Sequence, residues 1–221
     1  MMWHWFRKKY NDNHPDYWKA YVDSFDKKIK KPIQETRFIA FDTETTGFDK
    51  KEDRILSIGA VEIINKTIKA NTALEIYIKQ DVFKPETVKI HGILKDGDLK
   101  KISEEEAIQR FLGYIKNDIL IAHHAGFDYA MVNEMLLRHG LGKLKNEFID
   151  TGVLFSKSKH IIYHENLKKH YTLDDLCKEL NVSMADRHTS IGDALITALV
   201  FLKTITRLDK RNVLKWDYLI K

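Results

Sequence analysis

Two acidic residues close an apolar segment near the start of the chain. Asp42 and Glu44 follow the run RFIAF and stand two residues apart. Side chains two apart on a strand share a face, so both carboxylates are expected to point the same way. Like charges held together are unfavourable unless a cation lies between them, and Mg²⁺ or Mn²⁺ prefers such hard oxygen ligands. For this pair alone, a metal site and a strand-end pair hydrogen-bonded within a turn are equally expected.

Two further acidic residues lie at the beginnings of predicted helices. Asp128 follows the apolar run ILIA within HHAGFD, and Asp193 ends RHTSIGD, with His188 five residues before it. Each has an ordinary explanation, because a carboxylate is favourable in the first turn of a helix and a lone histidine is more often structural than catalytic. Together with Asp42 and Glu44, however, they stand at element ends on three separate segments, where site residues usually sit. The joint pattern favours an active site.

The elements that must position these residues form a mixed α/β pattern. Three β-rich runs separated by short polar connections come first, as in an antiparallel meander, and helices then alternate with short apolar strands. The predicted strands cover 37–45, 54–64, 72–80, 119–125 and 147–152, and the main predicted helices cover 104–116, 127–139 and 191–208. This order predicts an α/β fold with a mixed five-stranded sheet flanked by helices. Ser103 before Glu106 and Thr172 before Asp175 are predicted helix caps.

The first 35 residues are rich in aromatic side chains and are predicted to form an N-terminal helical extension with a break near Pro15. The large rings are Trp3, Trp5, Phe6, Tyr10, Tyr17, Trp18, Tyr21 and Phe25. So many apolar rings rarely stay in water, so packing on the main domain or on a partner is expected before stacking on bases. The predicted division is a helical arm over 1–35, a domain over 36–205 and a short basic tail over 206–221.

Composition limits the class of protein. The 221 residues include 43% apolar and 31% charged side chains, which is typical of a folded domain and not of a disordered chain. The sequence has no apolar run long enough to span a membrane and no signal peptide, so no membrane partner is expected. The single cysteine, Cys177, excludes an internal disulfide framework and a multi-cysteine zinc site, and it favours the reducing cytoplasm.

Three segments carry a resemblance to a known family. FDTETTG (41–47), AHHAGFD (122–128) and RHTSIGDA (187–194) are similar, in this order, to the three motifs of the DnaQ-like 3′→5′ exonucleases of the DEDD type whose third motif carries histidine. The resemblance extends over about residues 36–205 and implies a ribonuclease H-like fold. One departure is His124, where the family usually has asparagine; it removes no metal ligand.

The resemblance implies a role for each candidate residue. Catalytic and metal-binding positions would be Asp42, Glu44, Asp128 and Asp193, which hold two Mg²⁺ or Mn²⁺ ions, with His188 as the catalytic general base. Contacts to the terminal nucleotide would come from Thr45, from Phe127 and from His91 in the segment KIHGI. Asp150 would be a structural helix cap. The reaction would be hydrolysis of the terminal 3′ phosphodiester with release of nucleoside monophosphates.

The leading hypothesis is an exonuclease of proofreading or repair type acting on single-stranded or frayed DNA 3′ ends. Thr45 after the glutamate is similar to the proofreading branch of the family, and an exoribonuclease related to RNase T or oligoribonuclease is the alternative. A non-catalytic nucleic-acid-binding or polymerase-associated module is less expected, because all five catalytic residues are present. The N-terminal arm could dock a polymerase or another protein partner.

Overall fold

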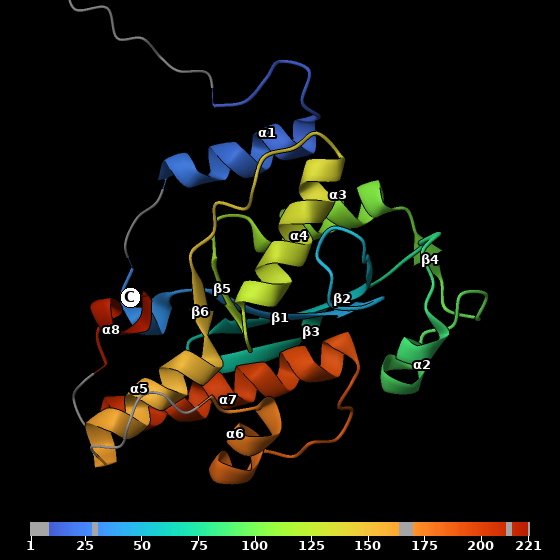
Figure 1. Cartoon of the computed structure of the whole chain (residues 1–221). Coiled ribbons are helices and arrows are strands. Elements are labelled where there is room, and N and C mark those ends of the chain that lie inside the picture. The colour runs from blue at the N-terminus through green and yellow to red at the C-terminus, as the bar shows by residue number, and fades with distance from the viewer. Residues whose placement is uncertain (1–8, 28–30, 164–169, 211–213, 221) are drawn as a thin grey trace, which may run out of the picture.

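The computed structural model describes residues 9–27, 31–163, 170–210 and 214–220 (Figure 1). Its strands are β1 (Phe38–Thr45), β2 (Ile55–Ile64), β3 (Thr67–Ile78), β4 (Lys101–Ile102), β5 (Ile119–Ala122) and β6 (Phe148–Asp150). Its helices are α1 (Asp16–Asp23), α2 (Pro85–His91), α3 (Glu104–Ile115), α4 (Gly126–Arg138), α5 (Thr151–Tyr163), α6 (Leu173–Leu180), α7 (Ser190–Lys210) and α8 (Trp216–Ile220). Short 3₁₀ turns cover Ser24–Lys27 and Ile33–Glu35. Among these helices, none combines the length and the apolar character that crossing a membrane requires.

One mixed sheet forms the centre of the molecule, with the strand order β4-β3-β2-β1-β5-β6. β1, β2 and β3 form the predicted antiparallel meander, and β5 and β6 continue the sheet in parallel on the other side of β1. The α/β prediction is confirmed, with six strands instead of five. The additional strand, β4, pairs in parallel with the end of β3 and is only two residues long. A segment this short carries no alternating pattern that a sequence could reveal.

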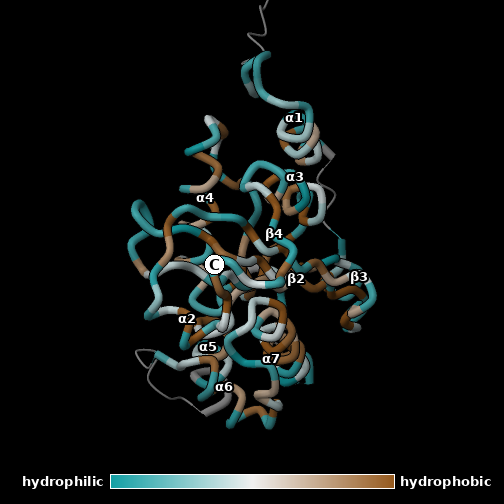
Figure 2. The backbone as a smooth tube through the Cα atoms, turned by 90° about the vertical axis from the view of Figure 1, so that its right-hand side faces the viewer, coloured by the Kyte–Doolittle hydropathy of each residue, from teal (hydrophilic) through white to brown (hydrophobic). Residues whose placement is uncertain are grey.

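Strand β1 separates two hydrophobic cores. Ile39 and Phe41 pack into the core shared with α1, α3 and α4, whereas Phe38 and Ala40 pack into the core shared with α7 and α8. Figure 1 shows α3 and α4 on one side of the sheet and α5, α6 and α7 on the other, and Figure 2 shows that hydrophobic residues are concentrated in the central strands and α7. Because side chains alternate along a strand, the positions after Phe41 are divided between the two faces in the same way.

Gly59 allows α7 to begin directly beside β1. It lies on β2 opposite Asp42 in the strand register. A methyl group added at Gly59 would lie only 2.2 Å from the backbone nitrogen of Ile191, in the first turn of α7. A glycine inside a strand often marks such a close approach of another backbone. The start of α7 is therefore held against the middle of the sheet, next to the end of β1.

Helix α1 packs on the main domain against α3 (Figure 1). Trp18 and Tyr21 are almost fully buried in the core beneath it. The Tyr21 hydroxyl donates a hydrogen bond to Asn146 Oδ1 (2.6 Å) and accepts one from the backbone N–H of Lys145 (2.8 Å). The expectation that these rings pack inward is confirmed for α1, whereas the rings within residues 1–8 lie outside the described residues.

The predicted helix caps are present. Ser103 Oγ accepts a hydrogen bond from the backbone N–H of Glu106 (3.1 Å) at the start of α3. At the start of α6, Thr172 and Asp175 each bind the backbone N–H of the other, which is a complete capping box. At the other end of the domain, α7 continues to Lys210, beyond the predicted limit at residue 205. The division into arm, domain and tail stays a prediction.

Candidate active site

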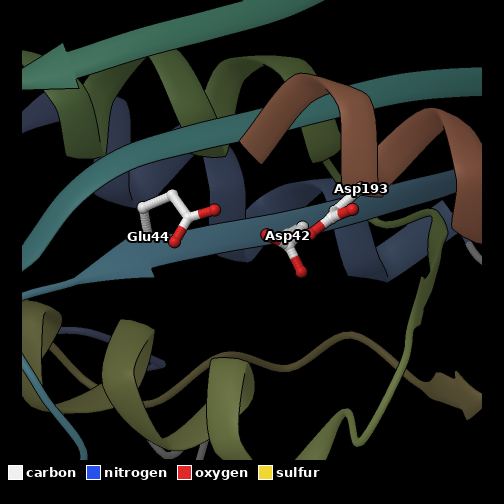
Figure 3. A group of neighbouring side chains, drawn as sticks. All are labelled: Asp42, Glu44 and Asp193. Carbon is white, nitrogen blue, oxygen red and sulfur yellow. The ribbon is translucent and has the colours of Figure 1, made fainter. Parts of the chain in front are cut away.

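Three of the predicted carboxylates meet at the end of β1. Asp42 and Glu44 lie on β1, and Asp193 lies in the first turn of α7. One oxygen from each of these side chains lies within 4.8 Å of the other two (Figure 3). The meeting follows from the fold, because even-numbered β1 positions face α7 and Gly59 lets α7 begin there.

Asp128 approaches the same point from the opposite face of β1. It is buried in the first turn of α4, and its Oδ1 accepts hydrogen bonds from the backbone N–H (3.0 Å) and the hydroxyl (2.7 Å) of Thr43. Thr43 stands between Asp42 and Glu44, so its side chain points to the α4 side. The sequence analysis did not identify Thr43, although strand alternation predicts its direction. We call Asp42, Glu44, Asp128 and Asp193 the carboxylate cluster.

Burial and crowding perturb the ionisation of three members of the carboxylate cluster, Asp42, Glu44 and Asp128. Burial, followed by the charges of Asp128, Asp193 and Glu44, raises the pKa of Asp42 well above its usual value. Burial and then the charge of Asp193 raise the pKa of Glu44 to about 7. Burial also raises the pKa of Asp128 to about 7, although its hydrogen bonds from Thr43 act in the opposite direction. Full ionisation of these groups near neutral pH therefore requires added positive charge.

Arg187 is a member of the site that the sequence analysis missed. Its Nη1 pairs with Asp193 Oδ2, and its Nε donates to Asp174 Oδ1 on α6 (2.8 Å). Its charge opposes the rise in the pKa of both Asp42 and Glu44. The sequence did contain one indication of Arg187, since this residue immediately precedes His188 in the third motif.

His188 lies on the exposed loop that leads into α7. Its backbone adopts a φ of 64°, and its backbone N–H lies 3.3 Å from Asp193 Oδ2. A positive φ is uncommon for residues other than glycine, and histidine is among those that adopt it more often. The backbone contact fixes the start of this side chain beside the carboxylate cluster. The imidazole makes no hydrogen bond within the described part of the chain, and its role as general base stays a prediction.

The residues predicted to contact a nucleotide lie on three segments. Thr45 Oγ1 donates to the Gly47 carbonyl (2.8 Å) in the turn after β1. His91, at the end of α2, accepts a hydrogen bond at Nδ1 from the Ile93 N–H (3.0 Å), and its buried Nε2 has no partner among the described residues. Burial lowers the pKa of His91, so the ring is neutral and has an Nε2–H available for donation.

Phe127, the third predicted contact, lies at the start of α4 beside a ring that the sequence analysis overlooked. The centroids of Phe127 and Phe48 are 5.8 Å apart, and Phe48 is 84% exposed. Two neighbouring rings, one of them exposed, offer a surface on which another aromatic group can stack. The signal in the sequence was the aromatic residue directly after TTG.

An ion pair joins the turn after β1 to α2. Asp53 is almost fully buried and accepts hydrogen bonds from Thr46 Oγ1 (2.7 Å) and from the backbone N–H of Asp49 (2.9 Å). Lys84, the residue before α2, places its Nζ 2.5 Å from Asp53 Oδ1. The turn that carries Thr45 and the helix that carries His91 are therefore linked.

Asp150 is the predicted structural cap. Its Oδ1 accepts from the backbone N–H of Gly152 (2.9 Å) at the start of α5, and its Oδ2 accepts from that of Ala125 (2.7 Å) before α4. The nearby His124 has a φ of 54°, a conformation that asparagine also adopts readily, and its ring lies 4.3 Å from that of His123. The departure from the family pattern at His124 is thus compatible with the local backbone.

The donor set of the carboxylate cluster fits a hard divalent cation. Its side chains offer only oxygen atoms, which Mg²⁺ and Mn²⁺ prefer. Asp193 Oδ1 is buried and has no hydrogen-bond partner in the described ranges. Buried polar atoms are almost always hydrogen-bonded, so an oxygen of this kind indicates a ligand that binds there.

Solved structures share this fold. The match to exonuclease I has a TM-score of 0.68 at 16% sequence identity, and it covers 80% of this chain and 42% of the exonuclease I chain. The match to exonuclease X, which was solved in complex with 5′ overhanging duplex DNA, has a TM-score of 0.60 at 20% sequence identity. It covers 84% of this chain and 97% of the exonuclease X chain. Both have the ribonuclease H-like fold, and that class of fold is the one this chain adopts.

The model of the exonuclease (RNase T) family matches residues 39–201, and the chain belongs to this family. DNA polymerase III subunit epsilon of Rickettsia prowazekii is 35% identical over 176 residues, which is 75% of this chain and 72% of that protein. The PolC-type DNA polymerase III of Caldanaerobacter subterraneus is 33% identical over 184 residues, 81% of this chain but only 12% of that protein. The resemblance to DnaQ-like exonucleases is confirmed.

Proposed function

We propose that this chain is a metal-dependent 3′→5′ exonuclease that releases nucleoside monophosphates from single-stranded or frayed DNA 3′ ends. The observation that carries the proposal is the meeting of Asp42, Glu44 and Asp193 oxygens within 4.8 Å in a domain of the exonuclease family. DNA is favoured over RNA because the similar proteins at about 30% identity are named as DNA polymerase III proteins.

The carboxylate cluster would hold two Mg²⁺ or Mn²⁺ ions. Bound ions of this kind lower the pKa of water and stabilise charge on the attacking and leaving oxygens. Glu44 and Asp128 would become fully ionised in their presence, because the added positive charge offsets the burial and the repulsion that raise the pKa of both groups to about 7.

His188 would accept the proton of the attacking water. Histidine changes charge near neutral pH, and a positioned general base contributes about 10²–10⁴-fold to a rate. Its side chain is exposed, while its backbone is anchored to Asp193, so the ring can reach toward the carboxylate cluster without losing its place.

The terminal nucleotide would lie between the turn after β1 and α2. Thr45 and the Nε2–H of His91 would contact its sugar or phosphate, and Phe127 with the exposed Phe48 would stack on its base. Stacking and backbone contacts carry little base information, so a weak sequence preference is expected. A single strand suits this arrangement because its end can be splayed onto the two rings.

A polymerase or another protein is the proposed partner, and the cytoplasm is the proposed location. The relatives named as subunits of DNA polymerase III support the first. The single cysteine, Cys177, is a buried free thiol, which suits a reducing compartment.

The test uses 5′-labelled single-stranded DNA and RNA of the same sequence, with Mg²⁺, Mn²⁺ or EDTA. The wild type is compared with Asp42→Asn and with Asp209→Asn, a matched change at an exposed ion pair with Lys66 on the far part of α7. Metal-dependent shortening from the 3′ end that Asp42→Asn abolishes and Asp209→Asn retains is the expected result. Faster shortening of RNA would replace DNA by RNA as the substrate, and shortening by Asp42→Asn at the wild-type rate would refute the assigned site.

A further inference from the structure

We propose that Arg187 is a positioning residue that orients the Asp193 carboxylate, so that only its Oδ1 faces the other members of the carboxylate cluster and is free to bind a metal ion. This inference rests on the proposed function and concerns how the site is assembled. It assigns to the third motif a function beyond supplying a ligand and a histidine.

The two oxygens of Asp193 have different surroundings. Oδ2 pairs with Arg187 Nη1 and also lies 3.3 Å from the backbone N–H of His188. Oδ1 is buried and has no hydrogen-bond partner among the described residues. A carboxylate that uses one oxygen for two donors cannot rotate freely, because rotation would break both contacts. The unpartnered oxygen is therefore fixed in one direction.

Arg187 is itself held from a second side. Its Nε donates to Asp174 Oδ1 (2.8 Å) in the first turn of α6, outside the carboxylate cluster. The guanidinium thus uses two different nitrogens to join the start of α6 to the start of α7. A planar guanidinium offers these donors in a fixed fork, whereas the ammonium of lysine is a single point charge. The contact with Asp174 fixes the angle at which Nη1 meets Asp193.

A simpler function for Arg187 would be to reduce repulsion among the carboxylates. A lysine would supply the same charge but could not bridge Asp174 and Asp193 with a fork. Arg187→Lys therefore separates orientation from charge, and Asp174→Asn weakens the support while leaving the arginine in place. Arg207→Lys, at a half-buried position on the last turns of α7, is the matched control.

The experiment measures binding of Mn²⁺ alone by isothermal titration calorimetry, together with kcat and KM on single-stranded DNA and thermal melting. Loss of a group that orients a metal ligand typically weakens metal affinity or activity about 10–100-fold. We expect Arg187→Lys to weaken Mn²⁺ binding by about this factor and to lower kcat more than it raises KM. Asp174→Asn should show a smaller change in the same direction, and Arg207→Lys none.

Mn²⁺ affinity of Arg187→Lys within about twofold of the wild type would overturn the proposal, because charge alone would then suffice. A wild type that does not bind Mn²⁺ would overturn it as well. A wild type that binds Mn²⁺ but does not shorten DNA or RNA would remove the proposed function, while the affinities of the variants would still decide the function of Arg187. If Arg187→Lys melts too low to titrate, Asp174→Asn decides, and wild-type affinity in that variant would overturn the proposal.

Discussion

The docked part of the N-terminal arm and the carboxylate cluster both bury polar groups, but these groups differ in how well they are hydrogen-bonded. In the arm, the Tyr21 hydroxyl both donates and accepts a hydrogen bond, and Trp18 fills a core position beside it. In the carboxylate cluster, burial and then the neighbouring like charges raise the pKa of Asp42, and Asp193 Oδ1 has no partner within the described ranges. Satisfied groups stabilise a fold, whereas unsatisfied ones are typical of sites that bind a ligand.

The packed arm therefore contributes to stability, whereas the carboxylate cluster reduces it. Burying crowded carboxylates destabilises the folded state, and the surrounding packing must offset that effect. Changes in the carboxylate cluster should therefore remove activity and raise stability, whereas changes in α1 should lower stability and leave the activity of the folded protein unchanged.

The largest effect is expected from Asp42→Asn. Removing a central ligand should lower kcat by about 10³-fold or more, since several kcal/mol of transition-state stabilisation are lost. The same change removes a repelling charge, so the melting temperature measured in EDTA should rise. A lower melting temperature with retained nuclease activity would contradict both halves of the contrast.

Trp18→Ala should act in the opposite sense. Truncating a buried tryptophan typically lowers the free energy of unfolding by about 3–5 kcal/mol, which urea denaturation can measure. The kcat of the protein that remains folded should stay unchanged, because α1 packs against α3, whereas the carboxylate cluster lies on β1, α4 and α7. An unchanged stability would mean that α1 is dispensable to the fold.

Metal and pH should together change the free energy of unfolding of the protein through the carboxylate cluster. Because the pKa values of Glu44 and Asp128 are raised to about 7, the folded state binds more protons than the unfolded chain between about pH 4.5 and 7. Their contribution to stability therefore falls as the pH rises through this window in EDTA. Mg²⁺ at 100 times its Kd should restore about 2.7 kcal/mol at pH 8.

The variant Glu44→Gln isolates this pH effect. Its melting temperature in EDTA should fall less between pH 5 and pH 8 than that of the wild type, because the amide does not ionise. Parallel pH profiles of the two proteins would show that Glu44 titrates at its ordinary pKa.

Lys84→Met should have the smallest effect. Lys84 is half-exposed, and without it the buried Asp53 carboxylate keeps its hydrogen bonds from Thr46 and Asp49. Loss of the ion pair should therefore cost about 1 kcal/mol and raise KM for single-stranded DNA by no more than about fivefold. The kcat should stay close to that of the wild type because the carboxylate cluster is untouched. The matched control is Lys66→Met, whose ion pair to Asp209 lies on another surface. Equal KM values for both variants would mean that the Lys84 link does not position α2.

Local patterns predicted much of the fold and the common direction of Asp42 and Glu44. Alternation along β1 is a property of neighbouring residues, and so are the caps at Ser103 and Thr172. The family motifs supplied the rest of the predicted carboxylate cluster. These features need no knowledge of distant contacts, which explains why the sequence was sufficient.

The missed features depend on residues far apart in the chain. Thr43 binds Asp128 from 85 positions away, and the strand pattern gives its direction but not its partner. Arg187 could be paired with Asp174 only once α6 and α7 were placed. Gly59 has meaning only when the backbone of α7 lies against it. β4 is too short to carry any pattern of its own.

Tyr21 and Asn146, which share a hydrogen bond, are 125 residues apart in the chain. A ribosome adds about 5–20 residues per second, so Asn146 is polymerised about 6–25 s after Tyr21. During that interval β1, β2 and β3 can already pair, since all three lie between the two positions. The N-terminal helix is therefore synthesised first and completes its docking late, and its aromatic rings stay exposed to chaperones and to other nascent chains for several seconds of every round of translation.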